Sequence, residues 1–125
     1  MKISVNARSR ISRSQIPIKE IIDIIKKLFK KEAVKGELSI TFCDDAYMKK
    51  LNSKYRNIDK STDVLSFEFG DGDNVMGDVY ISIPTAKRQA KEYNVSLKEE
   101  VLRLAMHGTL HVLGYKHKEM GVYGN

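Results

Sequence analysis

LKEEVLRLAMHGTLHVLGYKH (residues 97–117) is the most informative stretch of the chain, because it contains all three histidines, His107, His111 and His117. His107 and His111 are four residues apart, so on a helix they lie one turn apart on the same face. Gly114 can adopt the positive φ that ends many helices, which lets the chain turn back and bring His117 toward the pair. Three imidazoles with a fourth position left for water are typical of catalytic zinc sites. The spacing therefore predicts one zinc ion per chain.

A metal site is not the only interpretation of this spacing. Two histidines four residues apart on an otherwise apolar helix are more often core or surface residues than ligands. A third histidine behind a glycine, in a chain that has no other histidine, favours the metal site. The helix is also apolar on more than one side, so we expect it to be buried, and buried imidazole nitrogens need partners.

The composition is that of an ordinary globular protein. The chain has 125 residues, of which 42% are hydrophobic and 30% charged, which predicts a single domain over residues 1–125. No apolar run reaches membrane-spanning length, and the N-terminal MKISVNARSR has no apolar segment of the signal-peptide type. The single cysteine, Cys43, can form no internal disulfide. We therefore expect a cytoplasmic protein without a membrane partner.

The net charge of +6 is unevenly distributed along the chain. Residues 1–35 contain ten Lys or Arg and three acidic residues, a net charge of +7, and the remaining residues contain 12 and 13, a net charge of −1. A basic N-terminal third fits a phosphate-rich partner such as RNA, or it is simply a solvated lysine-rich helix face. The candidate RNA-binding residues of this region are Lys26, Lys27, Lys30 and Lys31.

Local patterns predict strands and helices in alternation. Alternating apolar residues predict strands at 2–7, 37–43, 63–69 and 75–83. Helices are predicted from Pro17 to a break at Gly36, over 45–54 after Asp44 or Asp45 as the cap, from Pro84 to Tyr93, and from a capping box of Ser96 and Glu99 through the histidines.

This order of elements predicts the fold class. The strands at 63–69 and 75–83 flank the turn GDGDN and are expected to pair as an antiparallel hairpin. In the helix over 45–54 and its end, Met48, Leu51 and Tyr55 are expected to face inward. The expected fold is α+β: one four-stranded mixed sheet with a terminal β-hairpin, packed by about four helices, the last of which is a zincin-like metal helix.

The residue after the first histidine distinguishes between reactions. Metzincin proteases use the same histidine spacing and carry a glutamate at this position as the general base for peptide hydrolysis. Here the position is Gly108. A bound metal would still lower the pKa of its water to near ~7. A phosphodiester, whose negative oxygens suit a cation and a basic surface, is therefore the better substrate hypothesis.

Four further polar residues are candidates for the site. Arg56 lies in an expected loop without an obvious core role, and a guanidinium binds phosphate through two hydrogen bonds. It would otherwise be a surface arginine paired with Asp59 or Asp63. Asp63 and Asp78 lie at or near strand starts, where aspartate often caps a turn, and Ser66 lies within a strand. Spacing alone leaves these alternatives open.

Three segments together resemble the YbeY family of bacterial metal-dependent endoribonucleases, which act in ribosomal RNA maturation and ribosome quality control. They are NSKYRNIDKSTDVLSF (52–67), MGDVYISIPTAKRQAKEY (76–93) and HGTLHVLGYKH (107–117). The resemblance covers roughly residues 38–117 in unbroken order. Lys116 departs from the family pattern, which usually has an aspartate before the third histidine.

The resemblance implies a site and a function. It implies that His107, His111 and His117 bind zinc, that Arg56 and His111 are catalytic, and that Arg56 contacts the RNA. The implied activity is single-strand-specific cleavage in the maturation of the 3′ end of small-subunit ribosomal RNA, with the small ribosomal subunit as partner and a monomer as the expected state. The alternatives are an RNA- or ribosome-binding assembly factor with a structural metal, and a small metallopeptidase that lacks the usual glutamate.

Overall fold

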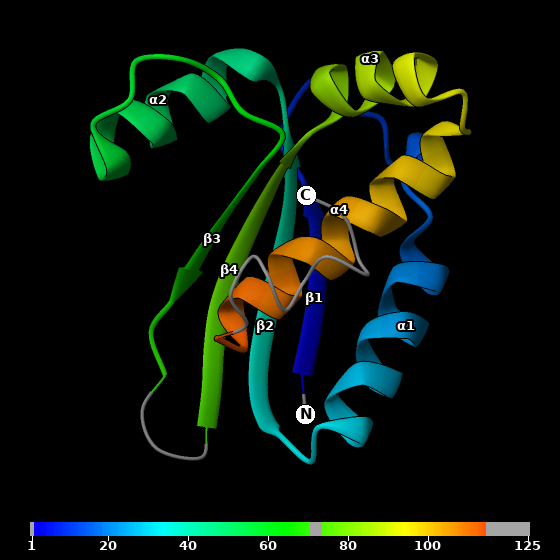
Figure 1. Ribbon diagram of the computed structural model, residues 1–125, viewed down its shortest axis with the longest axis vertical. Helices are drawn as coiled ribbons and strands as arrows, with labels where there is room; N and C mark the ends of the chain where they lie inside the picture. Colours follow the sequence, from blue (N-terminus) through cyan, green and yellow to red (C-terminus); the bar gives the residue numbers. More distant parts are fainter. Residues whose placement is uncertain (1, 71–73, 115–125) are drawn as a thin grey trace.

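The computed structural model describes residues 2–70 and 74–114. Its elements are β1 (Lys2–Ala7), the 3₁₀ turn η1 (Arg13–Gln15), α1 (Ile18–Lys31), β2 (Lys35–Cys43), α2 (Asp45–Arg56), β3 (Val64–Glu68), β4 (Asn74–Ser82), α3 (Ile83–Tyr93) and α4 (Leu97–Val112). The strands form one sheet in the order β1-β2-β4-β3, in which β1, β2 and β4 are parallel and β3 is antiparallel (Figure 1). For the described residues this confirms the predicted α+β fold with a four-stranded mixed sheet and four α-helices.

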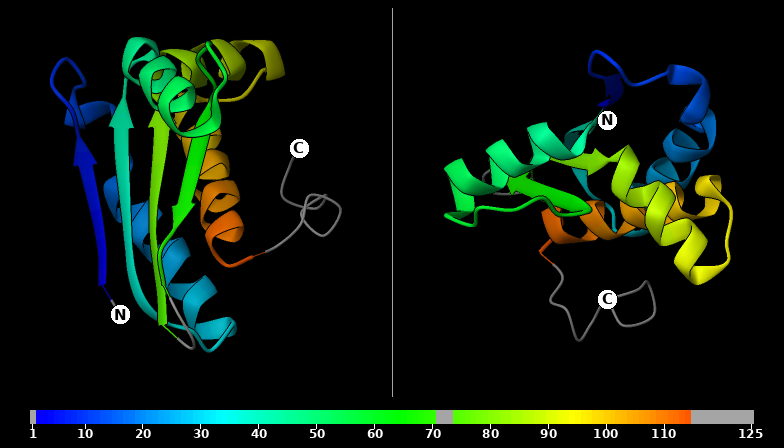
Figure 2. Two further views of the ribbon diagram at one scale, coloured as in Figure 1. Left: turned by 90° about the vertical axis from the view of Figure 1, so that its left-hand side faces the viewer. Right: turned by 90° about the horizontal axis from the view of Figure 1, so that it is seen from above.

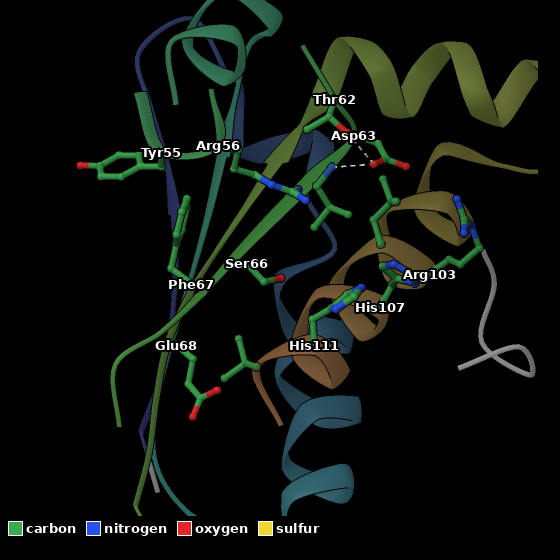
Figure 3. Close-up of a pocket in the computed structure, with 13 residues that line it drawn as sticks. Tyr55, Arg56, Thr62, Asp63, Ser66, Phe67, Glu68, Arg103, His107 and His111 are labelled. Carbon is green, nitrogen blue, oxygen red and sulfur yellow. Dashed lines mark hydrogen bonds between the residues drawn. The ribbon is translucent and has the colours of Figure 1, made fainter. Parts of the chain in front are cut away.

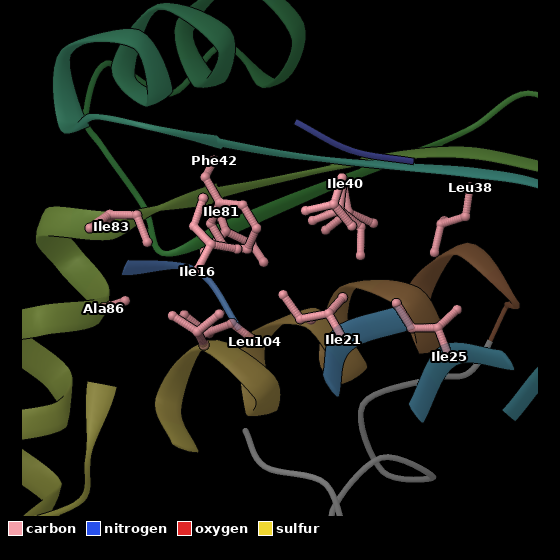
Figure 4. Close-up of a cluster of buried hydrophobic side chains, with 14 of the residues drawn as sticks. Ile16, Ile21, Ile25, Leu38, Ile40, Phe42, Ile81, Ile83, Ala86 and Leu104 are labelled. Atoms are coloured by element: carbon pink, nitrogen blue, oxygen red, sulfur yellow. The ribbon is translucent and has the colours of Figure 1, made fainter. Parts of the chain in front are cut away.

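The main hydrophobic core lies between one face of the sheet and the helices α1, α3 and α4 (Figures 2 and 4). Ile21 and Ile25 of α1 and Leu104 of α4 face Ile40 and Ile81 of the two central strands, and all five side chains are buried. This arrangement follows from the sequence, because alternate strand residues are apolar and α1 is apolar on one face. Within the described residues, no helix is long and apolar enough to cross a bilayer.

The other face of the sheet is covered in part by α2. Met48 of α2 packs there against Cys43 and Leu65, and all three are buried. The prediction that Tyr55 also faces inward is wrong, because its side chain is 57% exposed. The reason is the position of the helix: the C-terminal end of α2 projects past β3, the outermost strand (Figure 1).

The C-terminal end of α1 differs from the prediction. The helix ends at Lys31 rather than at Gly36, because Ala33 adopts a left-handed φ of 54° and the Val34 N–H donates to the Phe29 carbonyl at 3.1 Å. This is the hydrogen bond of a Schellman motif. Gly36 instead lies within β2 with a φ of 144°, where an added Cβ would lie 1.8 Å from the Val75 carbonyl oxygen. The glycine allows close approach of two strands.

The N-terminal end of α1 also differs slightly from the prediction. Pro17 precedes the helix as the N-cap residue, and the first helical residue is Ile18. Proline at this point has a fixed φ and makes no side-chain capping bond. The expected start of the helix is therefore displaced by one residue.

The predicted antiparallel pairing of β3 with β4 is confirmed by the register, in which Leu65 lies opposite Tyr80. The Phe69 N–H donates to the Met76 carbonyl at 2.7 Å, so the pairing extends beyond β3. The turn residues 71–73 lie outside the described residues. Among residues 2–70 and 74–114, β3 pairs only with β4, so its other edge is free of strand partners in this part of the chain, and this edge borders the site described next.

Candidate active site

The ends of α4 are fixed by the local signals in the sequence. At its start, Ser96 and Glu99 form the predicted capping box: the Glu99 N–H donates to Ser96 Oγ at 3.0 Å, and the Ser96 N–H donates to Glu99 Oε1 at 3.4 Å. At its end, Gly114 has the predicted positive φ, 89°, and its N–H donates to the His111 carbonyl at 3.0 Å. The histidine helix is therefore held at both ends.

Gly108 lets α4 lie close against the sheet. A Cβ at this position would lie 2.6 Å from Val79 Cγ1 and 3.0 Å from Val64 Cγ2, both shorter than ordinary contact distances. In addition, the Ser66 hydroxyl donates to the Gly108 carbonyl at 2.9 Å. The position after His107 therefore faces the sheet, and the glutamate of a metzincin protease would not fit there.

A cleft of about 580 Å³ opens between α4, the free edge of β3 and the C-terminal end of α2 (Figure 3). Side chains from both faces of β3 line it, because Ser66 points to the α4 side and Phe67 to the α2 side. The other lining residues are Tyr55, Arg56, Thr62, Asp63, Val64, Glu68, Arg103, Leu104, His107, His111 and Val112.

Two of the three predicted zinc ligands lie together in this cleft. The rings of His107 and His111 have centroids 4.8 Å apart with an interplanar angle of 68°. His107 is 7% exposed and His111 is partly exposed. His117 lies outside the described residues, and within those residues no group of three metal-ligating side chains is found. The donor set present, two adjacent imidazoles facing a cleft and followed by a turn at Gly114, fits a histidine-bound ion.

Arg56 is the last residue of α2, and not a loop residue as predicted. The helix continues to this point because Asn57 supplies a left-handed C-cap, with a φ of 59°. The exposed Arg56 side chain points across the cleft toward α4 (Figure 3). Among the described residues it forms no ion pair: Asp59 pairs with Lys49 at 3.9 Å instead. The predicted alternative, an arginine occupied by a neighbouring aspartate, is therefore wrong for this part of the chain.

Asp63 lines the cleft, but both of its oxygens are used for local structure. Oδ1 accepts hydrogen bonds from the Val64 N–H at 2.8 Å and from the Thr62 hydroxyl at 3.3 Å. Oδ2 accepts one from Gln89 Nε2 at 3.1 Å. The interpretation of Asp63 as a capping residue is the one that the structure supports.

Asp78 does not belong to the cleft. It lies on the face of the sheet opposite α4, in a shallow hollow that Lys2 and Met76 also line. Burial raises the pKa of its carboxyl. Strand alternation explains the correction: Gly77 and Val79 face α4, so the residue between them faces away.

Asp45 anchors the end of the sheet to α2. Its carboxylate accepts hydrogen bonds from Ser82 Oγ at 2.5 Å, Thr85 Oγ1 at 2.6 Å and Arg88 Nη2 at 2.8 Å. It also accepts one from Ser61 in the loop after α2, at 3.2 Å. Burial alone would raise the pKa of Asp45, but these hydrogen bonds outweigh it and hold the pKa at about 2. The helix that presents Arg56 is thereby tied to β4 and α3.

Sequence reasoning missed Arg103. It lies one helical turn before His107, so the same spacing argument that relates the histidines would have found it. Its guanidinium binds Glu100 through two hydrogen bonds, of 2.8 Å from Nε and 2.7 Å from Nη2. Glu100 is only 1% exposed, and Arg103 is 24% exposed at the rim of the cleft. The hydrogen bond to Glu100 raises the pKa of Arg103.

The predicted RNA-binding lysines are exposed, but none of them lines the cleft, because α1 lies on the other side of α4 (Figure 1). A second basic surface, made by Lys49, Lys50 and Lys54, lies on α2 next to Arg56. This surface was not predicted from the sequence, because residues 36–125 have a net charge of −1 as a whole and the three lysines of α2 do not stand out in that sum.

Comparison with known proteins gives consistent matches. The family model described as Endoribonuclease YbeY matches residues 4–121. An Endoribonuclease YbeY of Desulforamulus reducens is 40% identical over 123 residues, which cover 90% of this chain and 80% of that protein. One of Flavobacterium johnsoniae is 42% identical over 87 residues, which cover 70% and 63%. One of Aquifex aeolicus is 51% identical over 88 residues, which cover 68% and 59%. The chain thus spans less than two thirds of the second and third of these relatives.

Among solved structures, a protein of Thermotoga maritima determined in solution has the same fold. It superposes with a TM-score of 0.67 at 23% sequence identity, covering 97% of this chain and 85% of that one.

Proposed function

The chain belongs to the Endoribonuclease YbeY family, and from this we propose that it cleaves single-stranded RNA in the cleft between α4 and β3. The single observation that carries the proposal is the placement of His107 and His111 across from Arg56, which forms no ion pair with any described residue. The biological substrate that we propose is the 3′ end of small-subunit ribosomal RNA, which the protein would mature in the cytoplasm. We propose that it acts as a monomer, associates with the small ribosomal subunit and also takes part in ribosome quality control.

We propose further that α4 is a zincin-like metal helix, in which His107, His111 and His117 hold one zinc ion per chain. The adjacent imidazoles of the first two residues and the turn at Gly114 support this donor set. When bound, zinc supplies a positive charge beside the phosphate and activates water near neutral pH. Zinc binds imidazole in its neutral form, so the proposed site requires all three histidines to be neutral.

The protein side chains orient the substrate. Arg56 can donate two parallel hydrogen bonds to a phosphate that enters the cleft, and from the end of α2 it directs that phosphate toward the histidines. Because the guanidinium has a fixed fork, it also stabilises the charge that develops on the phosphate oxygens in the transition state. Ser66 and Asp63 keep their hydrogen bonds to protein groups and shape the wall of the cleft.

One observation favours a second candidate, an RNA-binding assembly factor with a structural metal. Both oxygens of Asp63, the carboxylate that the sequence suggested for the site, are occupied by hydrogen bonds within the protein. A metallopeptidase is disfavoured, because Gly108 faces the sheet where that chemistry needs a glutamate.

The test is metal analysis combined with RNA cleavage. Protein purified without chelator and without nickel resin should contain zinc at one equivalent, and removal of the metal should abolish cleavage of a ribosomal RNA fragment until zinc is returned. His111→Ala should bind the fragment but not cleave it. If chelated protein cleaves at the original rate, the metal is structural or absent and the assembly-factor function is the better conclusion.

A further inference from the structure

Tyr55 is an exposed aromatic residue at the mouth of the cleft. Its side chain is 57% exposed although it precedes the proposed phosphate-binding arginine directly in α2. Figure 3 shows the two side chains diverging: Arg56 points across the cleft toward α4, and the Tyr55 ring points away from it, beside Phe67. Single exposed rings are common on protein surfaces, but this one lines the cleft and packs against Phe67, which also lines it.

The ring of Tyr55 is held in place by aromatic residues of the sheet. It meets Phe67 of β3 edge-on, with centroids 5.3 Å apart and an interplanar angle of 66°. Phe67 in turn meets Tyr80 of β4 at 6.0 Å and 76°. The ammonium of Lys54 lies 5.2 Å from the Tyr55 centroid. The rings of Phe67 and Tyr80 hold the Tyr55 ring in position, and Lys54 adds a positive charge next to it. Such a ring is preorganised to bind a flat apolar group that has a negative charge nearby.

An unpaired nucleotide has this chemistry. Proteins that bind single strands combine cations for the phosphates with aromatic rings on which bases stack. Here the cations are Arg56 and Lys54, and both faces of the free edge of β3 line the cleft. A strand that crosses this edge can place a phosphate at Arg56 on the α4 side and a neighbouring base at Tyr55 on the α2 side.

We infer that Tyr55 is a positioning residue that stacks on an unpaired base next to the phosphate held by Arg56, and thereby gives the site its preference for single strands. The inference rests on the proposed function and adds the residue that sets its specificity. A base within a duplex is already stacked between its neighbours and is not available to the ring. Tyr55 therefore strengthens binding to single strands and leaves binding to duplexes unchanged.

The experiment compares affinities for a fluorescein-labelled oligouridylate, for the same strand annealed to oligoadenylate, and for strands that carry one abasic position. Binding is followed by anisotropy in the cold, and gels verify that the RNA stays intact. Tyr55→Ala should weaken single-strand binding by about tenfold, the usual effect of losing one stacked base, and leave duplex binding unchanged. Tyr55→Phe, which keeps the ring, should bind as the wild-type protein does.

Two controls separate stacking from folding. Phe69→Ala removes an aromatic side chain that is 62% exposed but does not line the cleft, and it should not change affinity. The abasic strands provide the second control: one abasic position should weaken binding to the wild-type protein and have no further effect on binding to Tyr55→Ala. This result is expected only if that base and that ring are partners.

The outcomes are distinguishable from those for the proposed function. If the wild-type protein cleaves the single strand and Tyr55→Ala binds it with unchanged affinity, the stacking role is refuted and the proposed function stands. Equal losses toward single strand and duplex also refute it, because they indicate a change in charge or fold. If the wild-type protein neither binds nor cleaves RNA, the proposed function is refuted together with the inference.

Discussion

Replacing Arg103 with methionine should destabilise the protein far more than replacing an exposed lysine in an ion pair of equal length. Arg103 Nη2 and Lys98 Nζ each lie 2.7 Å from a carboxylate oxygen, of Glu100 and Glu20 respectively. The two pairs differ in burial: the Glu100 side chain is 1% exposed and that of Glu20 is 42% exposed. Arg103→Met therefore leaves a carboxylate in the protein interior, whereas Lys98→Met leaves one in water.

The expected magnitudes follow from this difference. Loss of one partner of a buried pair costs about 3–5 kcal/mol, and because Arg103 itself is partly exposed we expect a value near the lower end, about 3 kcal/mol. Loss of an exposed pair costs about 0–1 kcal/mol. For a chain of this size, about 3 kcal/mol corresponds to a fall of about 10 °C in Tm. Adding Glu100→Gln to Arg103→Met should restore about half of the loss, because a buried amide costs less than a buried carboxylate.

Urea unfolding of these three variants and the wild-type protein, followed by circular dichroism, measures these differences. A loss below about 0.5 kcal/mol for Arg103→Met would refute the reasoning, because it would mean that water or another cation reaches Glu100 without Arg103. So would a double variant less stable than Arg103→Met, since removal of the unpaired charge should relieve the cost.

Three further outcomes are expected. Arg56→Lys keeps the charge but loses the planar fork, so single-turnover cleavage of a ribosomal RNA fragment should slow by about tenfold or more while thermal unfolding is unchanged. The control variant Arg88→Lys, which lies outside the cleft, should cleave at the wild-type rate. Gly108→Ala should lower the free energy of unfolding by about 1–2 kcal/mol in urea titrations, because overpacking against Val79 exceeds the gain in helix propensity. The pKa of Asp45, about 2, lies below its value in the unfolded chain, so the stability that the ionised carboxylate gives the fold is complete above pH ~4 and is lost as the pH falls toward 2. The free energy of unfolding of the wild-type protein should therefore fall over this pH range by an amount that Asp45→Asn does not show.

The histidine helix could be predicted from sequence because its determinants are local. Ser96 and Glu99 cap each other across three residues, and Gly114 follows the last turn directly. Its burial also followed from the sequence, since apolar residues occupy more than one side of it. The end of α1 could not be predicted in this way. Ala33 in a left-handed conformation is unfavourable by itself, and it is offset by packing of Val34 against the main core, a tertiary contact.

The composition of the cleft was predictable only in part, for the same reason. His107 and His111 share a helix face, so spacing alone brings them together. Arg56 and Tyr55 belong to the site because α2 overhangs the free edge of β3, and this depends on the strand order, which no local pattern encodes. Asp78 was wrongly considered for a related reason: its strand was identified correctly, but the sequence did not tell which face of the sheet would carry the cleft.

The position after the first histidine connects packing with chemistry. Glycine suits position 108 because α4 lies so close to β3 and β4 that even a Cβ would be overpacked. This closeness brings Ser66 to the Gly108 carbonyl and His107 to the wall of the cleft. A fold in which the histidine helix packs this closely against the sheet has no room at this position for the glutamate that peptide hydrolysis uses. It retains imidazoles on one wall and a guanidinium on the other, and these groups suit a negatively charged substrate, although the exposed Glu68 also lines the cleft. A phosphodiester is such a substrate, and for this reason the absence of a side chain at Gly108 supports RNA cleavage as the function of the site.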